Sequence, residues 1–300
     1  MAPPAIGFIG FGEAGFHIAK GLLGAGVPRV AAFDIHTYTP GRGETIQRRA
    51  RESDVALAGS SRQLSTRCDI ILSTVTASSA LEAAQQTAPF LRAGQIYADL
   101  NSVSPDSKRS IDATVRGAGA RFVEGAIMSP VAPHGHRAPI LLGGEAAREF
   151  AEVMAPFGMR LEVLDTSVGS AAAVKMFRSI VVKGLEALLF ECVLGAGRYG
   201  AEKRVFDSLA DSYPGVDWDR LANYTIGRVV EHGERRAREM EEVAKTLRAL
   251  GIEPIMAEAT ARRQDWAAQL DLRSKFGSEG PSGYADVLRA IGEHSSAAGT

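Results

Sequence analysis

One long stretch of the chain is apolar on almost every side of a helix. Residues 169–200 contain mostly alanine, valine, leucine, isoleucine, methionine and phenylalanine, with no proline, and the run is too long for one strand. This pattern predicts a helix of about seven or eight turns. Apolar residues nearly all round are typical of a buried helix, so we expect the protein interior to enclose it.

A polar stripe interrupts this apolar helix. Its members recur on one helical face, and they are Lys175, Ser179, Lys183 and Glu186. A buried helix carries lysine only where the amine has a partner or faces a cleft. We therefore expect one end of the stripe to face the functional site.

Short apolar runs alternate with helical patterns through the first half of the chain. We expect strands at 5–9, 30–33, 54–57, 70–75, 95–99, 121–127, 139–142 and 161–164. Such alternation predicts a doubly wound, largely parallel sheet. Ligands of these sheets bind at the carboxyl ends of the strands. The residues just past those ends are Gly10, Asp34, Thr76, Asn101 and Met128.

The second half of the chain has a purely helical pattern. After the long helix we expect further helices at 203–212, 217–228, 229–250, 254–270 and 284–291, and we find no convincing strand. Because the two halves differ in this way, we predict two domains, at 1–167 and 168–300. The long helix would join them.

The first strand runs directly into a glycine pattern and then into a helix. Gly10, Gly12 and Gly15 form GxGxxG, and Asp34 ends the second strand. This context separates the dinucleotide fingerprint from a chance glycine pattern. Gly10 would allow the tight turn, Gly12 the close approach of a pyrophosphate, and Gly15 the packing of helix on strand. The predicted fold class is therefore α/β, a Rossmann-like domain followed by an all-α domain.

We expect the cofactor to contact the whole glycine motif and the loops after the neighbouring strands. The candidate residues are Gly10, Phe11, Gly12, Glu13, Ala14, Gly15, Asp34, Val75, Thr76, Asn101 and Ser102. The helix that follows the motif would supply N–H donors and positive dipole to the phosphates.

Asp34 bears on the choice between NAD and NADP. A carboxylate at this position would bind the adenosine ribose hydroxyls and repel a 2′-phosphate, which favours NAD. Arg42, Arg48 and Arg49 follow. They form either a solvated surface, which we favour, or a phosphate clamp that would permit NADP.

Composition narrows the class of protein. The 300 residues carry a formal charge of −1 and are 45% hydrophobic, as expected for a soluble globular protein that binds neither nucleic acid nor membrane. The N-terminus lacks the basic segment of a signal peptide. Cys68 and Cys192 are far apart, which indicates neither a disulfide framework nor a metal site. We expect a cytoplasmic protein.

Several motifs together resemble those of the β-hydroxyacid dehydrogenases and the related 6-phosphogluconate dehydrogenases, in particular an uncharacterised subgroup. The resemblance covers about residues 5–292. The segment at 7–15 resembles the family's glycine signature, and 99–105 is similar to its D-x-S-T-x-S-P segment, with Ser102 at the threonine position near the nicotinamide ribose. Arg238-Glu239-Met240 is similar in place to the family's K-D-L segment.

The same resemblance implies a catalytic lysine. The segment from Gly169 to Lys175 resembles the family's G-x-x-x-x-x-K, so we expect Lys175 to be the general acid/base. The structural alternative is a lysine that snorkels from the helix or pairs with Glu186. Ser179 replaces the asparagine of the family; it would bond a substrate hydroxyl or, alternatively, a carbonyl of its own helix.

The substrate contacts depart from the family pattern. The family's D-A-P-V-S-G-G aligns on 124–130, which places Met128 on the serine, and Ser129 and Pro130 on the glycines. Pro130 has no N–H to offer a carboxylate. We expect Met128 and Ser129 to line the substrate site. His232 and Arg236 are further candidates, although a solvated helix face also explains them.

The sequence thus predicts an NAD(P)-dependent oxidoreductase. Its expected substrate is a small hydroxy acid or the oxo counterpart, bearing a carboxylate, and its expected assembly is a homodimer built on the all-helical half. Two alternatives remain, an imine reductase-like enzyme and a non-catalytic sensor that binds NAD(P). The retained Lys175 favours the dehydrogenase.

Overall fold

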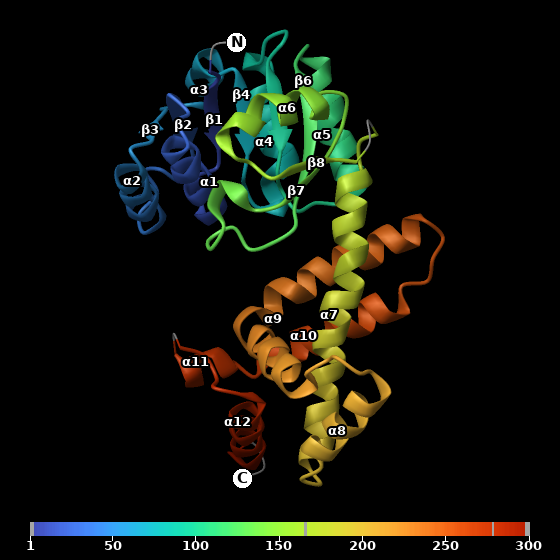
Figure 1. The fold of residues 1–300 in the computed structure, drawn as a ribbon. Helices are drawn as coiled ribbons and strands as arrows, with labels where there is room; N and C mark the ends of the chain where they lie inside the picture. Colours follow the sequence, from blue (N-terminus) through green and yellow to red (C-terminus); the bar gives the residue numbers. More distant parts are fainter. Residues whose placement is uncertain (1–2, 165–166, 278, 298–300) are drawn as a thin grey trace. The chain divides into compact units, whose positions relative to one another are not determined.

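The computed structural model describes residues 3–164, 167–277 and 279–297 of the chain. The backbone divides into two compact units, Met1–Lys175 and Met176–Thr300 (Figure 1). Helix α7 (Ser170–Gly197) begins in the first unit and continues in the second. Each unit has apolar clusters of its own.

An eight-stranded sheet forms the centre of the first unit, in the order β3-β2-β1-β4-β5-β6-β7-β8. Neighbouring strands run parallel except β6 and β7, which are antiparallel. The strands are β1 (Ala5–Ile9), β2 (Arg29–Phe33), β3 (Ala56–Leu57), β4 (Ile70–Ser73), β5 (Ile96–Asp99), β6 (Arg121–Ile127), β7 (Ile140–Gly143) and β8 (Leu161–Val163). The predicted doubly wound, mostly parallel sheet is confirmed.

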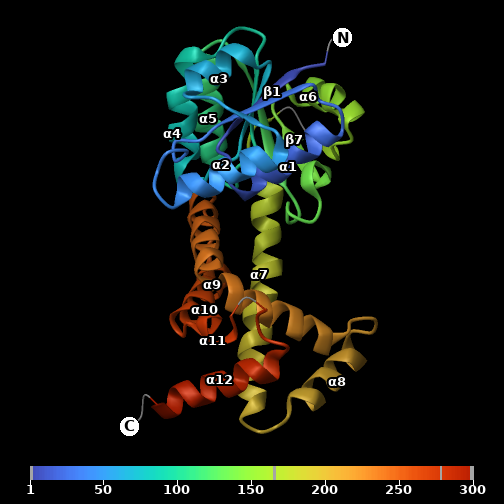
Figure 2. The ribbon, with the colours of Figure 1, turned by 90° about the vertical axis from the view of Figure 1, so that its left-hand side faces the viewer.

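Helices cover both faces of this sheet (Figure 2). One apolar cluster joins Phe8 of β1 to α1 (Glu13–Gly24), α2 (Arg42–Ser53) and α6 (Ala147–Met154). The other joins Ile71 of β4 to α3 (Ser61–Arg67), α4 (Ala80–Thr87) and α5 (Pro105–Gly117). Short 3-10 turns complete the unit, η1 (Ala77–Ser79), η2 (Ala88–Phe90), η3 (Gly135–Arg137) and η4 (Ala155–Phe157). Both faces are thus buried, as a parallel sheet requires.

Helices are the secondary-structure elements of the second unit, and its described residues contain no strand. Besides α7 it contains α8 (Glu202–Ser212), α9 (Trp218–Ala249), α10 (Ile255–Gln269), α11 (Leu272–Phe276) and α12 (Tyr284–Ala297). Gly233 allows α9 and α10 to approach closely, because a Cβ there would lie 2.9 Å from the carbonyl oxygen of Gln264. The predicted all-α region is confirmed.

The helical unit differs from the prediction in two places. The expected helices at 217–228 and 229–250 are one 32-residue helix, α9, which starts where the Asp217 side chain accepts a hydrogen bond from the N–H of Arg220. No proline lies within it to end the first segment, so the backbone ladder continues. The short α11 was not predicted, since five residues are too few to show a helical period.

The prediction that α7 is buried on nearly all sides is wrong for one face. Val174, Val181 and Leu188 recur every seventh residue and are 45%, 69% and 57% exposed. Their spacing places them on one side of the helix. Among the described residues no helix, α7 included, is long and apolar enough to cross a bilayer.

Candidate functional site

The glycine turn after β1 has the geometry that a phosphate-binding loop needs. Gly10 has a φ of +85°, and a Cβ there would lie 2.7 Å from the carbonyl oxygen of Thr74. A Cβ at Gly15 would lie 2.7 Å from the carbonyl oxygen of Gly10, whereas at Gly12 it would meet no atom within 4 Å. The fold thus requires glycine at positions 10 and 15, whereas no protein atom occupies the space beside the backbone of Gly12. This open backbone fits the pyrophosphate of a dinucleotide.

The start of α1 adds donors to this turn. Gly12 is the N-cap of α1 and carries no side chain that caps it, and Glu13 and Ala14 follow in the first turn. The first N–H groups of a helix lack intrahelical partners, and the helix dipole makes this end positive. Glu13 is exposed, so its carboxylate reaches solvent. The turn therefore presents N–H groups suited to an anion.

Asp34 fastens the glycine turn to the end of β2. Its Oδ2 accepts a hydrogen bond from the N–H of Phe11 at 2.8 Å, and its Oδ1 accepts one from the N–H of His36 at 2.9 Å. Each carboxylate oxygen keeps a further lone pair. The carboxylate is thus compatible with a ribose hydroxyl while it holds two backbone segments in place.

The three arginines after Asp34 do not gather into one cluster. Arg48 pairs with Glu52 at 3.7 Å, and the guanidinium of Arg49 lies 5.9 Å from the ring centre of Phe16. Only Arg42 turns to the loop after β2, where its Nη1 lies 3.3 Å from Nε2 of His36. The surface interpretation therefore holds for Arg48 and Arg49, and Arg42 is the one left for a phosphate contact.

The residues after β4 lie against the glycine turn. The hydroxyl of Thr74 donates to the carbonyl oxygen of Gly10 at 2.8 Å, and Cγ1 of Val75 approaches the same glycine. Thr76 is exposed, and its Oγ1 lies 3.2 Å from the hydroxyl of Ser78. Val75 and Thr76 are therefore placed beside the candidate phosphate loop.

Asn101, a predicted cofactor contact, is a buried residue of the loop after β5. It is 4% exposed, and its Nδ2 donates to Oγ of Ser73 at 2.9 Å and to Oδ1 of Asp99. Its amide nitrogen therefore ties the loop to the ends of β4 and β5, while its Oδ1 is buried without a hydrogen-bond partner among the described residues. Ser102, the next residue, is exposed at the edge of the sheet. Of this predicted pair, only Ser102 presents its side chain to solvent.

A buried ion pair that sequence reasoning missed supports the same loop. The Nζ of Lys108 donates to Oδ2 of Asp99 at 2.8 Å and to the carbonyl oxygen of Gly125 at 3.1 Å, and both charged side chains are fully buried. One signal was present, because Lys108 shares the buried face of α5 with Ile111 and Val115. A lysine on a buried apolar helix face needs a buried partner, because an unpaired buried charge is costly.

The segment after β6 offers few backbone donors. The N–H of Met128 donates to the carbonyl oxygen of Pro139 at 2.8 Å, and Pro130 has none. The Ser129 hydroxyl is buried and has no hydrogen-bond partner among the described residues. Met128 can thus line a site only through its side chain, whereas Ser129 has an unused polar atom.

Lys175 lies in the second turn of α7, and it is half-buried. The start of this helix is anchored to β6, since both oxygens of the Glu124 carboxylate accept backbone N–H groups, from Gly169 at 2.5 Å and from Ala172 at 2.6 Å. Glu186, the partner considered for this lysine, pairs with Arg236. The first turn of α7, which precedes Lys175, is therefore attached to β6 through Glu124.

The remaining stripe residues belong to the second unit. The Nζ of Lys183 donates to Oγ of Ser179 at 2.9 Å and pairs with Glu239 at 3.0 Å. Burial lowers the pKa of Lys183, although the neighbouring Glu239 opposes this shift. Ser179 thus accepts a hydrogen bond from within its own helix.

The two substrate candidates on α9 differ in their surroundings. Arg236 is 5% exposed, and its Nη1 donates to Oε2 of Glu186 at 2.5 Å, while its Nε is buried without a hydrogen-bond partner among the described residues. Burial raises the pKa of Glu186. Burial also lowers the pKa of His232, whose Nε2 lies 3.3 Å from Glu231. Arg236 is buried within the helical unit and His232 is half-buried, and their contact with substrate stays a prediction.

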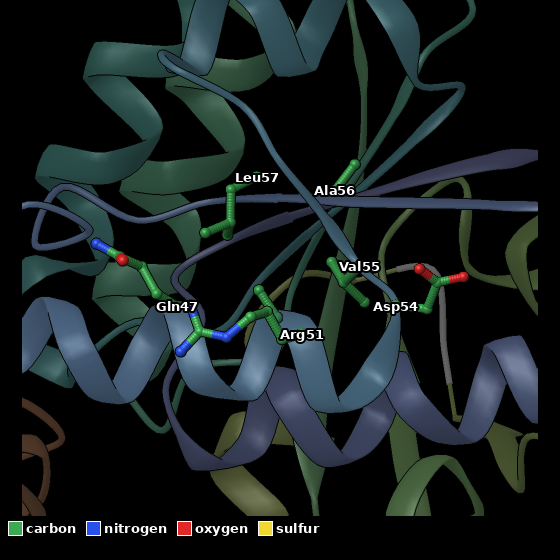
Figure 3. A pocket seen from close by; sticks show the side chains of 7 residues that line it. Gln47, Arg51, Asp54, Val55, Ala56 and Leu57 are labelled. Carbon is green, nitrogen blue, oxygen red and sulfur yellow. The ribbon is translucent and has the colours of Figure 1, made fainter.

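A pocket of about 390 Å³ opens at the edge of the sheet (Figure 3). Its lining comes from α2 and from the segment that enters β3, namely Gln47, Ala50, Arg51, Asp54, Val55, Ala56 and Leu57. None of the predicted site residues belongs to this lining. The pocket is thus separate from the glycine turn.

The fold and the glycine turn define a dinucleotide-binding protein. Residues 5–164 match the family described as the NAD binding domain of 6-phosphogluconate dehydrogenase, and the chain belongs to this family. Residues 196–267 match a second family, described as a domain of unknown function (DUF1932). The predicted family and the predicted NAD(P) cofactor are both confirmed.

Solved structures extend the similarity over nearly the whole chain. A conserved hypothetical protein from Sinorhizobium meliloti 1021 is 35% identical, with a TM-score of 0.79, over 97% of this chain and 96% of that one. The conserved protein MTH1747, of unknown function, is described as structurally similar to 3-hydroxyacid dehydrogenases. It is 32% identical, with a TM-score of 0.72, over 90% of this chain and 98% of that chain.

A characterised enzyme shares the fold at lower identity. The 3-hydroxyisobutyrate dehydrogenase of Mycobacterium tuberculosis, solved with L-serine, is 18% identical, with a TM-score of 0.73, over 89% of this chain and 94% of that chain. Similarity at this level establishes a common architecture.

Proposed function

We propose that the chain is an NAD(P)-dependent oxidoreductase that moves a hydride between the nicotinamide ring and a small hydroxy acid or its oxo counterpart. The observations that support this most are the open glycine turn and the attachment of the first turn of α7, which precedes Lys175, to Glu124 of the same sheet. The turn supplies backbone donors for a pyrophosphate. Lys175 supplies an amine at the position that carries the proton donor in the resembling enzymes. A protein that only sensed NAD(P) would need the first feature alone.

Lys175 is the proposed general acid/base. When bound, the nicotinamide supplies or accepts the hydride. The oxygen of the reacting carbonyl gains negative charge during reduction, and the ammonium of Lys175 would give it a proton. In the direction of oxidation, the neutral amine would take the hydroxyl proton. Glu124 holds the first turn of the helix that carries this lysine.

The proposed substrate bears a carboxylate. The dehydrogenase from Mycobacterium tuberculosis, which was solved with L-serine, supports a small acid of this kind. Backbone donors are scarce after β6 in this chain, since the Met128 N–H is engaged and Pro130 has none. The unused hydroxyl of Ser129 is therefore the first candidate for a substrate contact in this segment.

The proposed assembly is a homodimer built on the helical unit. Val181 and Leu188 project from one face of α7 and are more than half exposed in the single chain. Exposed apolar side chains aligned on a long helix are typical of an interface. A second copy of this chain would cover them.

A binding titration followed by a substrate panel tests the proposed function. NADH and NADPH are titrated by fluorescence, and their oxidation is then followed with small oxo acids, and separately with ketones mixed with amines. Turnover on an oxo acid is the expected result. Turnover only on the ketone and amine mixtures would identify an imine reductase. Tight binding without turnover on either set would identify a sensor.

A further inference from the structure

A fully buried carboxylate on β6 binds the first turn of α7. Glu124 is 0% exposed, and its Oε2 accepts the N–H of Gly169 at 2.5 Å while its Oε1 accepts the N–H of Ala172 at 2.6 Å. The two partners lie 45 and 48 residues further along the chain. The contact therefore joins the central sheet to the helix that carries Lys175.

The two N–H groups are those that a capping box satisfies. In that motif, side chains at the N-cap and at the third helical residue bond the backbone N–H groups of each other. Here Gly169 directly precedes α7 and has no side chain, and its carbonyl oxygen accepts the helical N–H of Ala173 at 2.9 Å. Ala172 is the third helical residue. One carboxylate from β6 thus accepts both N–H groups that two capping side chains would accept in a capping box.

The surrounding backbone is shaped around this contact. A Cβ at Gly143 on β7 would lie 2.8 Å from Oε2 of Glu124. Gly169 has a φ of +109°, and a Cβ there would lie 2.8 Å from Nη1 of Arg109 and 3.1 Å from Cβ of Pro105. The helix therefore cannot take a local capping side chain at Gly169. Its start depends on the carboxylate delivered by β6.

Lys175 lies close to this contact along α7. Lys175 follows Ala172 by three residues, which corresponds to an axial rise of about 4.5 Å, less than one turn. A carboxylate at a helix N-terminus also stabilises the positive end of the helix dipole. We propose that Glu124 is a positioning residue of the reaction, which sets the place of Lys175 through the first turn of α7. This inference rests on the proposed function.

Two variants of this contact and one control test the inference. Glu124→Gln keeps the side-chain size but sets an amide donor against one of the two N–H groups. Gly143→Ala keeps the carboxylate and displaces it. The matched control is Ser60→Ala, which removes the side-chain cap of α3, where Oγ accepts the N–H of Gln63 at 3.1 Å. Each is compared with the unmodified protein by hydrogen exchange, NADH titration and steady-state kinetics.

The expected result separates positioning from folding. In Glu124→Gln and Gly143→Ala, amide exchange in 169–177 speeds up at least tenfold and kcat falls at least tenfold, whereas KM and the NADH dissociation constant change less than twofold. Ser60→Ala leaves kcat and exchange at 169–177 unaltered. Unchanged exchange at 169–177 overturns the cap, and faster exchange with normal kcat overturns the positioning role. If the unmodified protein turns over no substrate, the proposed function fails, and the exchange data alone decide whether the cap exists.

Discussion

Asp34 shows how one side chain serves both the fold and a proposed binding site. Its two carboxylate oxygens accept the N–H groups of Phe11 and His36, so it ties the glycine turn to β2. The same charge would oppose the 2′-phosphate of NADP. Arg42, which lies beside His36, is the one residue of the loop that would favour this phosphate. The balance between Asp34 and Arg42 should therefore set the cofactor preference.

Replacing the charge of Asp34 should shift this preference. We expect the unmodified protein to bind NADH more tightly than NADPH. Asp34→Asn removes the repulsion and should raise the affinity for NADPH relative to NADH by about tenfold, which corresponds to about 1.4 kcal/mol. Asp54→Asn, an equal charge change at an exposed residue, is the control. Fluorescence titration gives the ratio, and a ratio that stays constant would refute the role of Asp34.

At the scale of elements, the loop after β5 rests on a buried ion pair. Lys108 on α5 pairs with Asp99 at the end of β5, and Asp99 in turn accepts a hydrogen bond from Asn101. Because both charges are buried, removing one partner leaves the other charged group unpaired in a medium of low polarity. The pair thus couples the stability of the unit to the shape of the loop that presents Ser102.

Two variants should separate stability from loop geometry. Lys108→Met should lower the free energy of unfolding by about 3–5 kcal/mol, because the Asp99 carboxylate stays buried without its partner. The double variant Asp99→Leu/Lys108→Met removes both charges and should regain most of this stability. It should still bind NADH more weakly, since Asn101 has lost an acceptor. Urea denaturation and NADH titration measure the two effects, and full recovery of both would contradict the coupling.

Elements set by local pattern could be predicted, and contacts between distant segments could not. The strands, α7 and the glycine turn follow from apolar periodicity and from the backbone freedom of Gly10. The antiparallel direction of β7 has no local signal. Glu124 looked like part of a buried strand, because its partners lie 45 and 48 residues away. The sequence also does not reveal that Ser73 and Asp99 accept hydrogen bonds from the amide nitrogen of Asn101.

For the whole molecule, the exposed face of α7 is the feature that a single chain leaves unexplained. Val174, Val181 and Leu188 align on one side of the helix. Burying apolar surface contributes roughly 25 cal/mol for each Å² removed from water, so a second copy on this face would be stabilised. The proposed homodimer accounts for the apolar character of α7 on this side.

Charges placed on this face should dissociate the dimer. We expect light scattering at micromolar concentration to give twice the chain mass for the unmodified protein. Val181→Glu combined with Leu188→Glu should give the mass of a single chain, because two carboxylates would be buried without partners. Tyr38→Glu, at an 82% exposed residue of the first unit, should stay dimeric. A monomeric unmodified protein would exclude this assembly.

The central claim is that Lys175 moves the proton, and turnover of Lys175→Met tests it most directly. Methionine keeps the apolar stem of lysine, so the fold should persist. Turnover should fall about 10² to 10⁴-fold with NADH affinity nearly unchanged. Lys183→Met should chiefly lower stability, since Glu239 loses one of its two ion pairs and keeps Arg235. Arg178→Met, at an exposed position on α7, should lower neither turnover nor stability. Near-normal turnover in Lys175→Met, or a larger loss in Lys183→Met, would contradict the account.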